Sequence, residues 1–238
     1  MKFSTKFISA TKEYCEFLHF VPAPYLRKSF EIDFVPEKAE MLVTGLGFYE
    51  FWLNGEHLTR GCLAPYISNP NDLIYYDRYD LTDKLKKGRN VIAFALGNGM
   101  QNPIGGEVWD FQLARWRSAP KLALCFECLG EGRDVSFEAD ETFKVHSSPI
   151  YFDDLRCGER YDARNEIPGW NLPEFDDSGW SNAIPVDGFP GFLPEILTHL
   201  HNLAAISRAI RRYFSWLEAG LAPSVRGSHF SPSRQSSA

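Results

Sequence analysis

A loop rich in amide side chains offers the clearest chemistry in the sequence. Residues 97–109 read GNGMQNPIGGEVW, a polar and glycine-rich stretch, and an aspartate follows. Amide and carboxylate groups hydrogen bond to sugar hydroxyls, and an aromatic ring stacks on the C–H face of a sugar. The candidate ligand-binding residues here are Asn98, Asn102, Glu107, Trp109 and Asp110. A turn role is the alternative for Asn98, which lies between two glycines.

A second set of candidate residues lies in the segment GERYDAR at 158–164. It supplies a ring, a carboxylate and a guanidinium within four positions, from Tyr161, Asp162 and Arg164. A carboxylate–guanidinium pair fixes a loop as easily as it binds a sugar. The alternative is therefore a buried Tyr161 ring with a structural brace between Asp162 and Arg164.

No residue is assigned a catalytic role. The sequence contains no GxSxG, HExxH or GxxxxGK[ST] pattern, and its six histidines are scattered. None of the 31 acidic residues lies in a motif that would raise the pKa of one member of a pair, which acid catalysis at neutral pH requires. We expect no cofactor. Calcium stays open, through Asp153-Asp154 or Asp176-Asp177, although neither spacing matches a defined calcium loop.

Composition excludes several classes of partner. The net charge of −6 argues against nucleic acid, whose phosphates need a basic surface. No stretch is apolar over 18 residues, so we expect no membrane span. The first 20 residues lack the continuous apolar region of a signal peptide, and the five cysteines are odd in number and irregularly spaced. We therefore expect a cytoplasmic protein.

The pattern of the chain up to residue 165 predicts an all-β, antiparallel sandwich or jelly roll. Asn54-Gly55 follows an expected strand at 48–53 and suits a type I′ hairpin turn, because both residues tolerate positive φ. Residues 80–87 read as a short helical turn that Asp80 or Thr82 caps. Further strands are expected at 26–34, 39–44, 56–59, 73–79, 90–96, 121–129, 135–137, 142–147 and 150–155.

We expect four regions: a lead-in at 1–24, the β-sandwich at 25–165, a closing strap at 166–190 and an atypical tail at 191–238. The tail holds five Lys and Arg but only two Asp and Glu, unlike the acidic remainder. Apolar residues at three- and four-residue steps predict a helix over 194–219, and a serine-rich end over 226–238 predicts disorder. A shifted reading frame or an early stop is an equally open explanation of this change in composition.

Four sequence blocks resemble known carbohydrate-active proteins. YEFWLNG at 49–55, YYDRYDLTD at 75–83 and GNG at 97–99 resemble segments of galactose-binding-like domains in large glycosidases. The fourth block is more specific. GERYDAR at 158–164, PGW at 168–170 and FDDSGW at 175–180 resemble the signature of the N-terminal domain of glycoside hydrolase family 78, the bacterial α-L-rhamnosidases. The similarity covers roughly residues 25–190.

This resemblance implies a galactose-binding-like sandwich that acts as a non-catalytic accessory or carbohydrate-binding module. In the family, an (α/α)₆ barrel cleaves terminal α-L-rhamnose with inversion, so the resemblance implies that this chain alone is inactive. It implies two partners, rhamnosides and the catalytic barrel, which the 158–164 segment would face. A free-standing carbohydrate-binding protein and the docking module of a β-galactosidase-like hydrolase are the alternatives, and YDAR disfavours the second.

Overall fold

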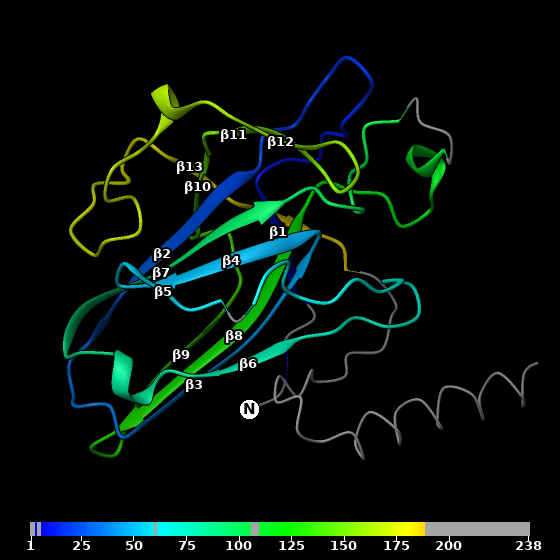
Figure 1. Ribbon diagram of the computed structural model, residues 1–238. Coiled ribbons are helices and arrows are strands. Elements are labelled where there is room, and N and C mark those ends of the chain that lie inside the picture. Colours follow the sequence, from blue (N-terminus) through cyan, green and yellow to red (C-terminus); the bar gives the residue numbers. More distant parts are fainter. Residues whose placement is uncertain (1–2, 4–5, 60, 106–109, 189–238) are drawn as a thin grey trace, which may run out of the picture. The chain divides into compact units, whose positions relative to one another are not determined.

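The computed structural model describes residues 3, 6–59, 61–105 and 110–188. Within these ranges the chain is built from strands, and every strand pairing is antiparallel (Figure 1). Helical structure in the described ranges is limited to three short 3₁₀ turns, η1 (Thr82–Lys84), η2 (Phe111–Leu113) and η3 (Ala163–Asn165). None of the described helices is long and apolar enough to cross a membrane. The expected helix at 194–219 and the expected disorder at 226–238 lie outside the described residues.

Two six-stranded sheets form the body of the described chain. The first sheet has the order β14-β1-β8-β3-β6, with β9 paired to β8; the second has the order β13-β10-β2-β7-β4-β5. The strands of the first sheet are β1 (Phe7–Ser9), β3 (Lys38–Leu46), β6 (Asp77–Asp80), β8 (Lys121–Gly130), β9 (Arg133–Glu138) and β14 (Ile184–Val186). Those of the second are β2 (Pro24–Ile32), β4 (Phe48–Leu53), β5 (Glu56–His57), β7 (Gly88–Gly97), β10 (Lys144–Ser147) and β13 (Ser181–Asn182).

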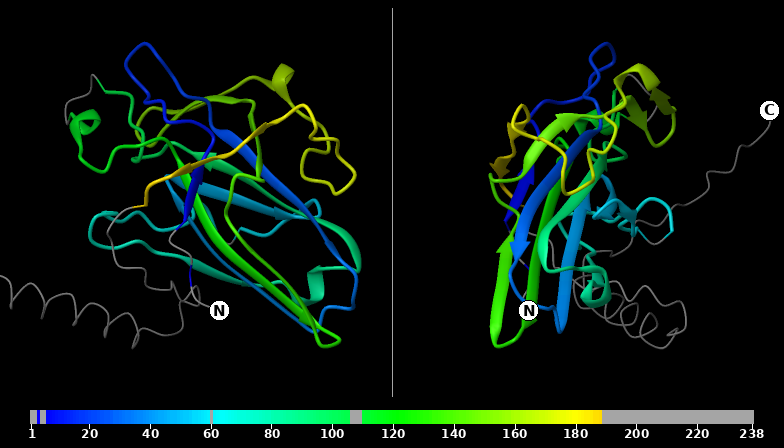
Figure 2. Two further views of the ribbon diagram at one scale, coloured as in Figure 1. Left: turned by 180° about the vertical axis from the view of Figure 1, so that it is seen from behind. Right: turned by 90° about the vertical axis from the view of Figure 1, so that its left-hand side faces the viewer.

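The two sheets pack face to face, which confirms the predicted sandwich (Figures 1 and 2). Successive side chains of a strand point to opposite faces, so alternate residues of each strand enter the core. Met41 and Phe126 come from the first sheet, and Phe51 and Phe94 from the second, and all four are fully buried in one cluster. Phe51 and Phe94 stack with their ring centroids 5.0 Å apart.

The Asn54-Gly55 turn forms as its residue types predict. Asn54 has φ 50° and Gly55 has φ 88°, so both residues occupy the left-handed region that a type I′ turn requires. The Asn54 side chain also fastens the turn to β7, since its Nδ2 donates to Asn90 Oδ1 at 2.9 Å and its Oδ1 accepts the Val91 N–H at 2.9 Å. The turn therefore helps to fix the register between β4 and β7.

Residues between 167 and 180, within the region 166–190 that we call the strap, pack on the outer face of the second sheet. Trp170 stacks on Tyr25 of β2 with a centroid distance of 3.8 Å and an interplanar angle of 7°. Beside them, the fully buried Arg27 of β2 pairs with Asp177 and donates through Nη2 to the Leu172 carbonyl oxygen at 2.9 Å. Burial lowers the pKa of Arg27, and the charge of Asp177 opposes that shift. A buried guanidinium thus holds the strap to the sheet.

Several local predictions differ from the structure. Residues 73–76 form no strand. The Thr44 hydroxyl donates a hydrogen bond to the Tyr75 carbonyl oxygen at 2.6 Å, and pairing with β3 begins only at Asp77. Asp80 does not cap η1. Its Oδ1 accepts the Thr82 N–H at 3.0 Å, while Leu81 occupies the N-cap position without a side-chain bond. The strands β1, β12, β13 and β14 are additional to those expected.

A third, two-stranded sheet lies apart from the sandwich strands. Its strands are β11 (Ile150–Asp154) and β12 (Gly158–Tyr161), and we refer to the pair as the ribbon. It lies at the end of the sandwich where β7 ends and β8 begins, next to the loop before β2 (Figures 1 and 2). This end, termed the loop end, carries the residues that the sequence singled out.

Candidate functional site

Three segments at the loop end enclose a groove. They are the β3–β4 turn, the segment 65–75 before β6 and the loop that follows β7. The groove holds about 420 Å³ of space, part of it open to solvent. Its lining combines rings with groups that can hydrogen bond, among them Thr44, Phe48, Tyr66, Ser68, Tyr75, Gln101 and Trp116. This mixture suits a small polar ligand that has an apolar face.

The glycines of the β3–β4 turn allow the backbones to meet at the floor of the groove. Gly47 has φ 103°, and a Cβ atom at this position would lie 2.1 Å from the Gly97 carbonyl oxygen. No other residue type fits such an approach. The segment 65–75 forms the opposite wall. It is held to β4 by the Tyr49 N–H, which donates to the Ala64 carbonyl oxygen at 2.7 Å, immediately before the cis Ala64–Pro65 bond.

Gln101 is a buried polar side chain that lines the groove. It is 5% exposed, and its Nε2 donates to the Trp116 carbonyl oxygen and to Ser118 Oγ at 3.0 Å. An amide carries an acceptor oxygen as well as its donors, so Gln101 brings a hydrogen-bonding side chain to the lining of the groove.

Tyr66 contributes an exposed ring to the same groove. Its side chain is 64% exposed, whereas Trp116 and Tyr75 are half-buried. An aromatic ring open to solvent at the rim of a groove offers a flat apolar face for stacking. Sequence reasoning did not select Tyr66, Gln101 or Trp116, because they lie on two loops that only the fold brings together. The signal available was a ring or amide within a loop between two strands.

The predicted residues Asn98 and Asn102 lie together, but inside the protein. Both are fully buried. Asn98 Nδ2 donates to the Val21 carbonyl oxygen at 2.8 Å and to Asp153 Oδ1 at 2.7 Å, and its Oδ1 accepts from Asn102 Nδ2 at 3.0 Å. These two amides therefore have internal partners and hold the loop after β7 against the ribbon.

Asp153 of the ribbon is the acceptor at the centre of this network. Its Oδ2 accepts the backbone N–H groups of Asn98 at 2.6 Å and Gly99 at 3.3 Å. Burial raises the pKa of the Asp153 carboxyl above its ordinary value, and the donors of Asn98 and Gly99 oppose that shift. Asp154, next in the chain, accepts the Arg156 N–H at 2.8 Å. Both carboxylates named as calcium candidates here thus carry hydrogen bonds from the protein.

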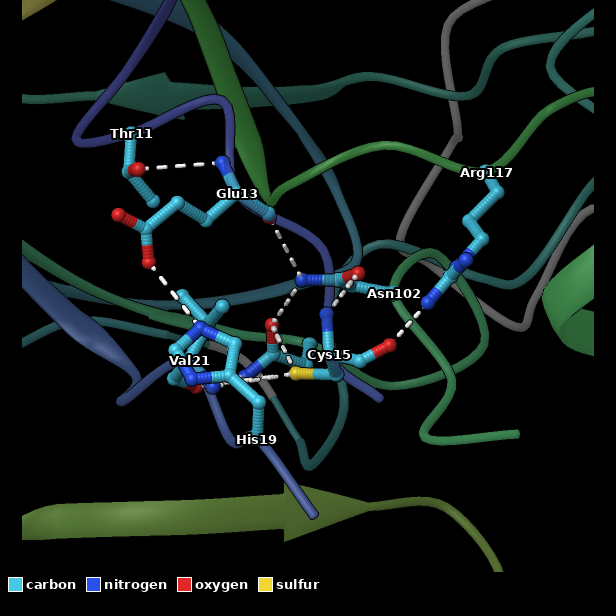
Figure 3. Close-up of polar contacts among 8 residues, drawn as sticks. Thr11, Glu13, Cys15, His19, Val21, Asn102 and Arg117 are labelled. Atoms are coloured by element: carbon cyan, nitrogen blue, oxygen red, sulfur yellow. Dashed lines mark hydrogen bonds and ion pairs between the residues drawn. The ribbon is translucent and has the colours of Figure 1, made fainter. Parts of the chain in front are cut away.

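The same network extends to the loop before β2 (Figure 3). The Cys15 N–H donates to Asn102 Oδ1 at 2.9 Å, and the guanidinium of Arg117 donates to the Cys15 carbonyl oxygen. Asn102 Nδ2 also reaches the Glu13 carbonyl oxygen at 3.4 Å. Burial raises the pKa of the Cys15 thiol. Three segments far apart in the sequence are thereby joined into one unit at the loop end.

The remaining predicted residues are at the surface. Asp110 is exposed with φ 48°, and its Oδ1 accepts from Gln112 Nε2 at 3.1 Å. The other two predicted residues of this loop, Glu107 and Trp109, lie outside the described residues. The structure therefore places Asp110 on the solvent side of the loop that buries Asn98 and Asn102.

Tyr161 and Arg164 are exposed at the end of β12, and Asp162 is half-buried. Arg164 Nη2 donates to Asp162 Oδ2 at 2.6 Å, and its Nε donates to Asp162 Oδ1 at 2.8 Å. The hydrogen bonds from Arg164 lower the pKa of Asp162 to about 2. The Tyr161 hydroxyl donates to Glu166 Oε1 at 2.8 Å, which raises the pKa of Tyr161. The brace between Asp162 and Arg164 forms, but the Tyr161 ring is exposed rather than buried.

In the described ranges, no three His, Cys, Asp or Glu side chains gather closely enough to hold a metal ion. The second pair of calcium candidates also carries protein contacts. Asp177 pairs with Arg27, and Asp176 Oδ1 accepts the Ser178 N–H at 3.0 Å.

Comparison with known proteins identifies the family. The sequence model of the α-L-rhamnosidase N-terminal domain matches residues 35–196, which is more than half of the chain. The chain belongs to this α-L-rhamnosidase N-terminal domain family. An α-L-rhamnosidase of Formosa agariphila is 30% identical in an alignment of 198 positions that covers 77% of this chain and 18% of the relative. The chain thus spans less than a fifth of that relative.

Solved structures agree with this assignment. The α-L-rhamnosidase of Dictyoglumus thermophilum superposes with a TM-score of 0.70 at 31% identity, over 81% of this chain and 22% of that one. The Streptomyces avermitilis α-L-rhamnosidase, solved in complex with L-rhamnose, gives a TM-score of 0.66 at 29% identity. The match covers 73% of this chain and 17% of that one. A lectin of Pleurotus ostreatus shares the fold alone, with a TM-score of 0.51 at 14% identity. The match covers 82% of this chain and 46% of the lectin chain.

Proposed function

We propose that this α-L-rhamnosidase N-terminal domain is a non-catalytic accessory module that binds rhamnosylated carbohydrate in the groove at its loop end. The observation that carries the proposal is the groove itself, which places the Gln101 amide near the exposed ring of Tyr66. A relative of known structure was solved with L-rhamnose, which motivates the choice of sugar. The bond cleavage that gives the relatives their name is assigned to the part of the polypeptide outside this domain.

The groove suits a deoxysugar for a physical reason. L-Rhamnose presents a methyl group and axial C–H bonds on one side and hydroxyls on the other. Tyr66 and Trp116 would contact the apolar side, since an aromatic ring offers a flat apolar face. The Gln101 amide would hydrogen bond to a hydroxyl on the polar side. The affinity of a groove this open is expected to lie near the millimolar range, about −4 kcal/mol.

The predicted residues at the surface remain candidate contacts for a longer glycan. Asp110, Tyr161, Asp162 and Arg164 offer hydroxyl, carboxylate and guanidinium groups to solvent. Glu107 and Trp109 keep the role that the sequence predicts for them. We propose that these residues contact sugars beyond the first, while Asn98 and Asn102 contribute by shaping the loop. The cytoplasmic location likewise stays a prediction from the sequence.

Titration of the purified chain with L-rhamnose, followed by tryptophan fluorescence, tests the proposal. Trp116 lines the groove and reports occupancy. We expect saturable binding that weakens about tenfold in Tyr66→Ala, because one stacking contact is lost. Tyr151→Ala removes an exposed ring from the ribbon and serves as the matched control. Absence of saturation, or equal affinity in Tyr66→Ala and the unmodified chain, would contradict the proposal.

The non-catalytic part of the proposal has its own assay. The chain is expected to release no nitrophenol from 4-nitrophenyl α-L-rhamnoside, whereas the full-length Formosa agariphila relative serves as the positive control. Turnover by the purified chain that survives repeated purification would contradict this part and leave sugar binding untouched.

A further inference from the structure

A second groove lies at the β14 edge of the first sheet, where β1 ends and β8 begins. It holds about 990 Å³ of space, part of it open to solvent, and it shares no described lining residue with the groove at the loop end. We call it the lysine groove. Its polar lining combines ammonium groups, hydroxyls, a ring and a carboxylate, from Ser9, Thr11, Lys12, Tyr14, Ser118, Lys121 and Asp187. In the described ranges, the loop-end groove is lined by no charged residue, so the two grooves suit different ligands.

Lys121 brings a poorly hydrated ammonium group to this groove. The residue is 9% exposed, and its Nζ donates to the Asp187 carbonyl oxygen at 2.7 Å. Because β1 lies between β8 and β14 in the sheet, the Lys121 side chain reaches over β1 to make this bond. Burial lowers the pKa of Lys121, and the charge of Asp187 opposes that shift. An ammonium held away from bulk water interacts more strongly with an anion than a fully hydrated one does.

Hydrogen bonds within the protein hold the walls of the lysine groove in shape. The Ser9 hydroxyl bridges the carbonyl oxygens of Thr11 at 2.8 Å and Pro120 at 2.7 Å, which joins the end of β1 to the segment before β8. The Glu13 N–H donates to Thr11 Oγ1 at 3.1 Å, and the Thr11 hydroxyl can still donate its own hydrogen (Figure 3). A site that is already formed loses little conformational entropy when it binds a ligand.

The charges of the lysine groove favour an anion. Its described lining carries two ammonium groups, those of Lys12 and Lys121, and one carboxylate, that of Asp187. Lys12 and Asp187 are exposed, so their side chains can turn toward a ligand or away from it, whereas Lys121 is anchored at one end of the groove. The chain as a whole has a net charge of −6, so a groove with an excess of positive charge departs from the rest of the molecule.

We propose that the lysine groove binds an anionic sugar residue through its oxyanion, which is either a uronate carboxylate or a sulfate ester. An ammonium gives strong, charge-assisted hydrogen bonds to such a group, and its three donors allow Lys121 to keep its bond to the Asp187 carbonyl oxygen. The Thr11 hydroxyl can donate to the ligand, and the Tyr14 ring, which is 45% exposed, offers a face to its C–H groups. The site does not depend on rhamnose binding in the loop-end groove.

Titration of the labelled chain with D-glucuronate, D-glucose 6-sulfate and D-glucose, followed by amide shifts in NMR, tests the proposal. At least one anionic sugar should bind about tenfold or more tightly than D-glucose, because the neutral sugar makes no charge-assisted hydrogen bond. The tighter of the two identifies the oxyanion. The shifts should gather at 9–14, 118–121 and 186–187. Equal affinity for D-glucose, shifts confined to other segments, or acetate and inorganic sulfate binding as tightly as the sugars would overturn the proposal.

Variants of exposed residues make the test specific, because they leave the fold intact. Lys12→Ala should weaken binding of the anionic sugar about two- to fivefold, and Asp187→Asn should strengthen it by a similar factor, since the competing carboxylate is removed. Lys87→Ala, which changes an exposed lysine outside the groove, is the matched control and should leave the affinity unchanged. Lys121→Met should abolish the preference over D-glucose, and Lys121→Arg should retain most of it. Unchanged affinity in both Lys12→Ala and Asp187→Asn, or an equal loss in Lys87→Ala, would overturn the proposal.

Discussion

Removing Asp177 should destabilise the protein more than removing its partner Arg27. The Arg27 side chain is 0% exposed and the Asp177 side chain is 20% exposed. Asp177→Ala therefore leaves a buried guanidinium with uncharged partners alone, the carbonyl oxygens of Leu172 and Phe175 and the Ser29 hydroxyl. Leaving one member of a buried pair uncompensated costs about 3–5 kcal/mol, and the partial exposure of Asp177 places the expected loss near the lower limit, about 3 kcal/mol.

Arg27→Met should cost less, about 2 kcal/mol. The methionine retains much of the apolar contact with the strap, and the carboxylate of Asp177 can be hydrated where it reaches solvent. The remaining loss comes from the carbonyl oxygens of Leu172 and Phe175, which Arg27 otherwise satisfies, at about 1 kcal/mol each. The double variant should cost well below the sum of the two, because the second change relieves the charge exposed by the first.

Urea unfolding followed by tryptophan fluorescence measures these losses, since Trp170 and Trp180 pack under or within the strap. For a domain of this size, about 3 kcal/mol corresponds to a fall in Tm of about 6–12 °C. Asp177→Asn, which keeps an oxygen acceptor without the charge, is the control and should lie between the unmodified chain and Asp177→Ala. Strictly additive losses, or an Asp177→Ala loss below about 0.5 kcal/mol, would refute the assignment of this pair as the buried fastening of the strap.

Three further outcomes follow from the same structure. The pKa of Asp162 is lowered from 3.8 to about 2, so its contribution to stability is complete above pH 3.8 and is lost as the pH falls through about 2; carboxyl NMR should show this value, and Arg164→Gln should return it toward 3.8. Gly47→Ala should cost over about 2 kcal/mol because of its contact with a carbonyl oxygen, whereas Gly88→Ala, with similar positive φ but open space, should cost only about 1 kcal/mol; equal losses in urea unfolding would contradict the close approach. Asn98→Ala should lower the unfolding free energy by about 2–3 kcal/mol through the donors lost to buried oxygens, and an unchanged value would show that the amide network is not structural.

Local patterns in the sequence were sufficient to predict the sandwich. The alternation of apolar residues located most strands, and Asn54-Gly55 located a turn, because both signals act over a few neighbouring residues. Strands β1 and β14, of three residues each, lack such a signal. They form through long-range pairing: β1 pairs with β14, with Phe7 opposite Val186, and also with β8, with Ile8 opposite Leu122. Long-range pairing of this kind leaves no periodic trace in the sequence.

In the candidate site, too, local patterns predicted the residue types, whereas long-range contacts decided where the side chains lie. Amide side chains in a glycine-rich loop predict exposure, yet Asn98 is buried because Asp153, 55 positions later, supplies its acceptor. The groove residues Tyr66 and Gln101 come from two loops that the β3–β4 turn brings together. Sequence spacing does not encode either approach. The residue types of the loop end were therefore predictable, whereas the division between its buried network and its open groove was not.

NMR would show directly whether L-rhamnose binds in the groove. Backbone amide shifts of the isotopically labelled chain would be followed while L-rhamnose is added to saturation. We expect the shifting amides to cluster around the groove, in 44–48, 65–75 and 100–101 and at Trp116. An absence of shifts at saturating sugar, or shifts confined to the opposite end of the sandwich around Val35 and Leu129, would contradict sugar binding in the groove.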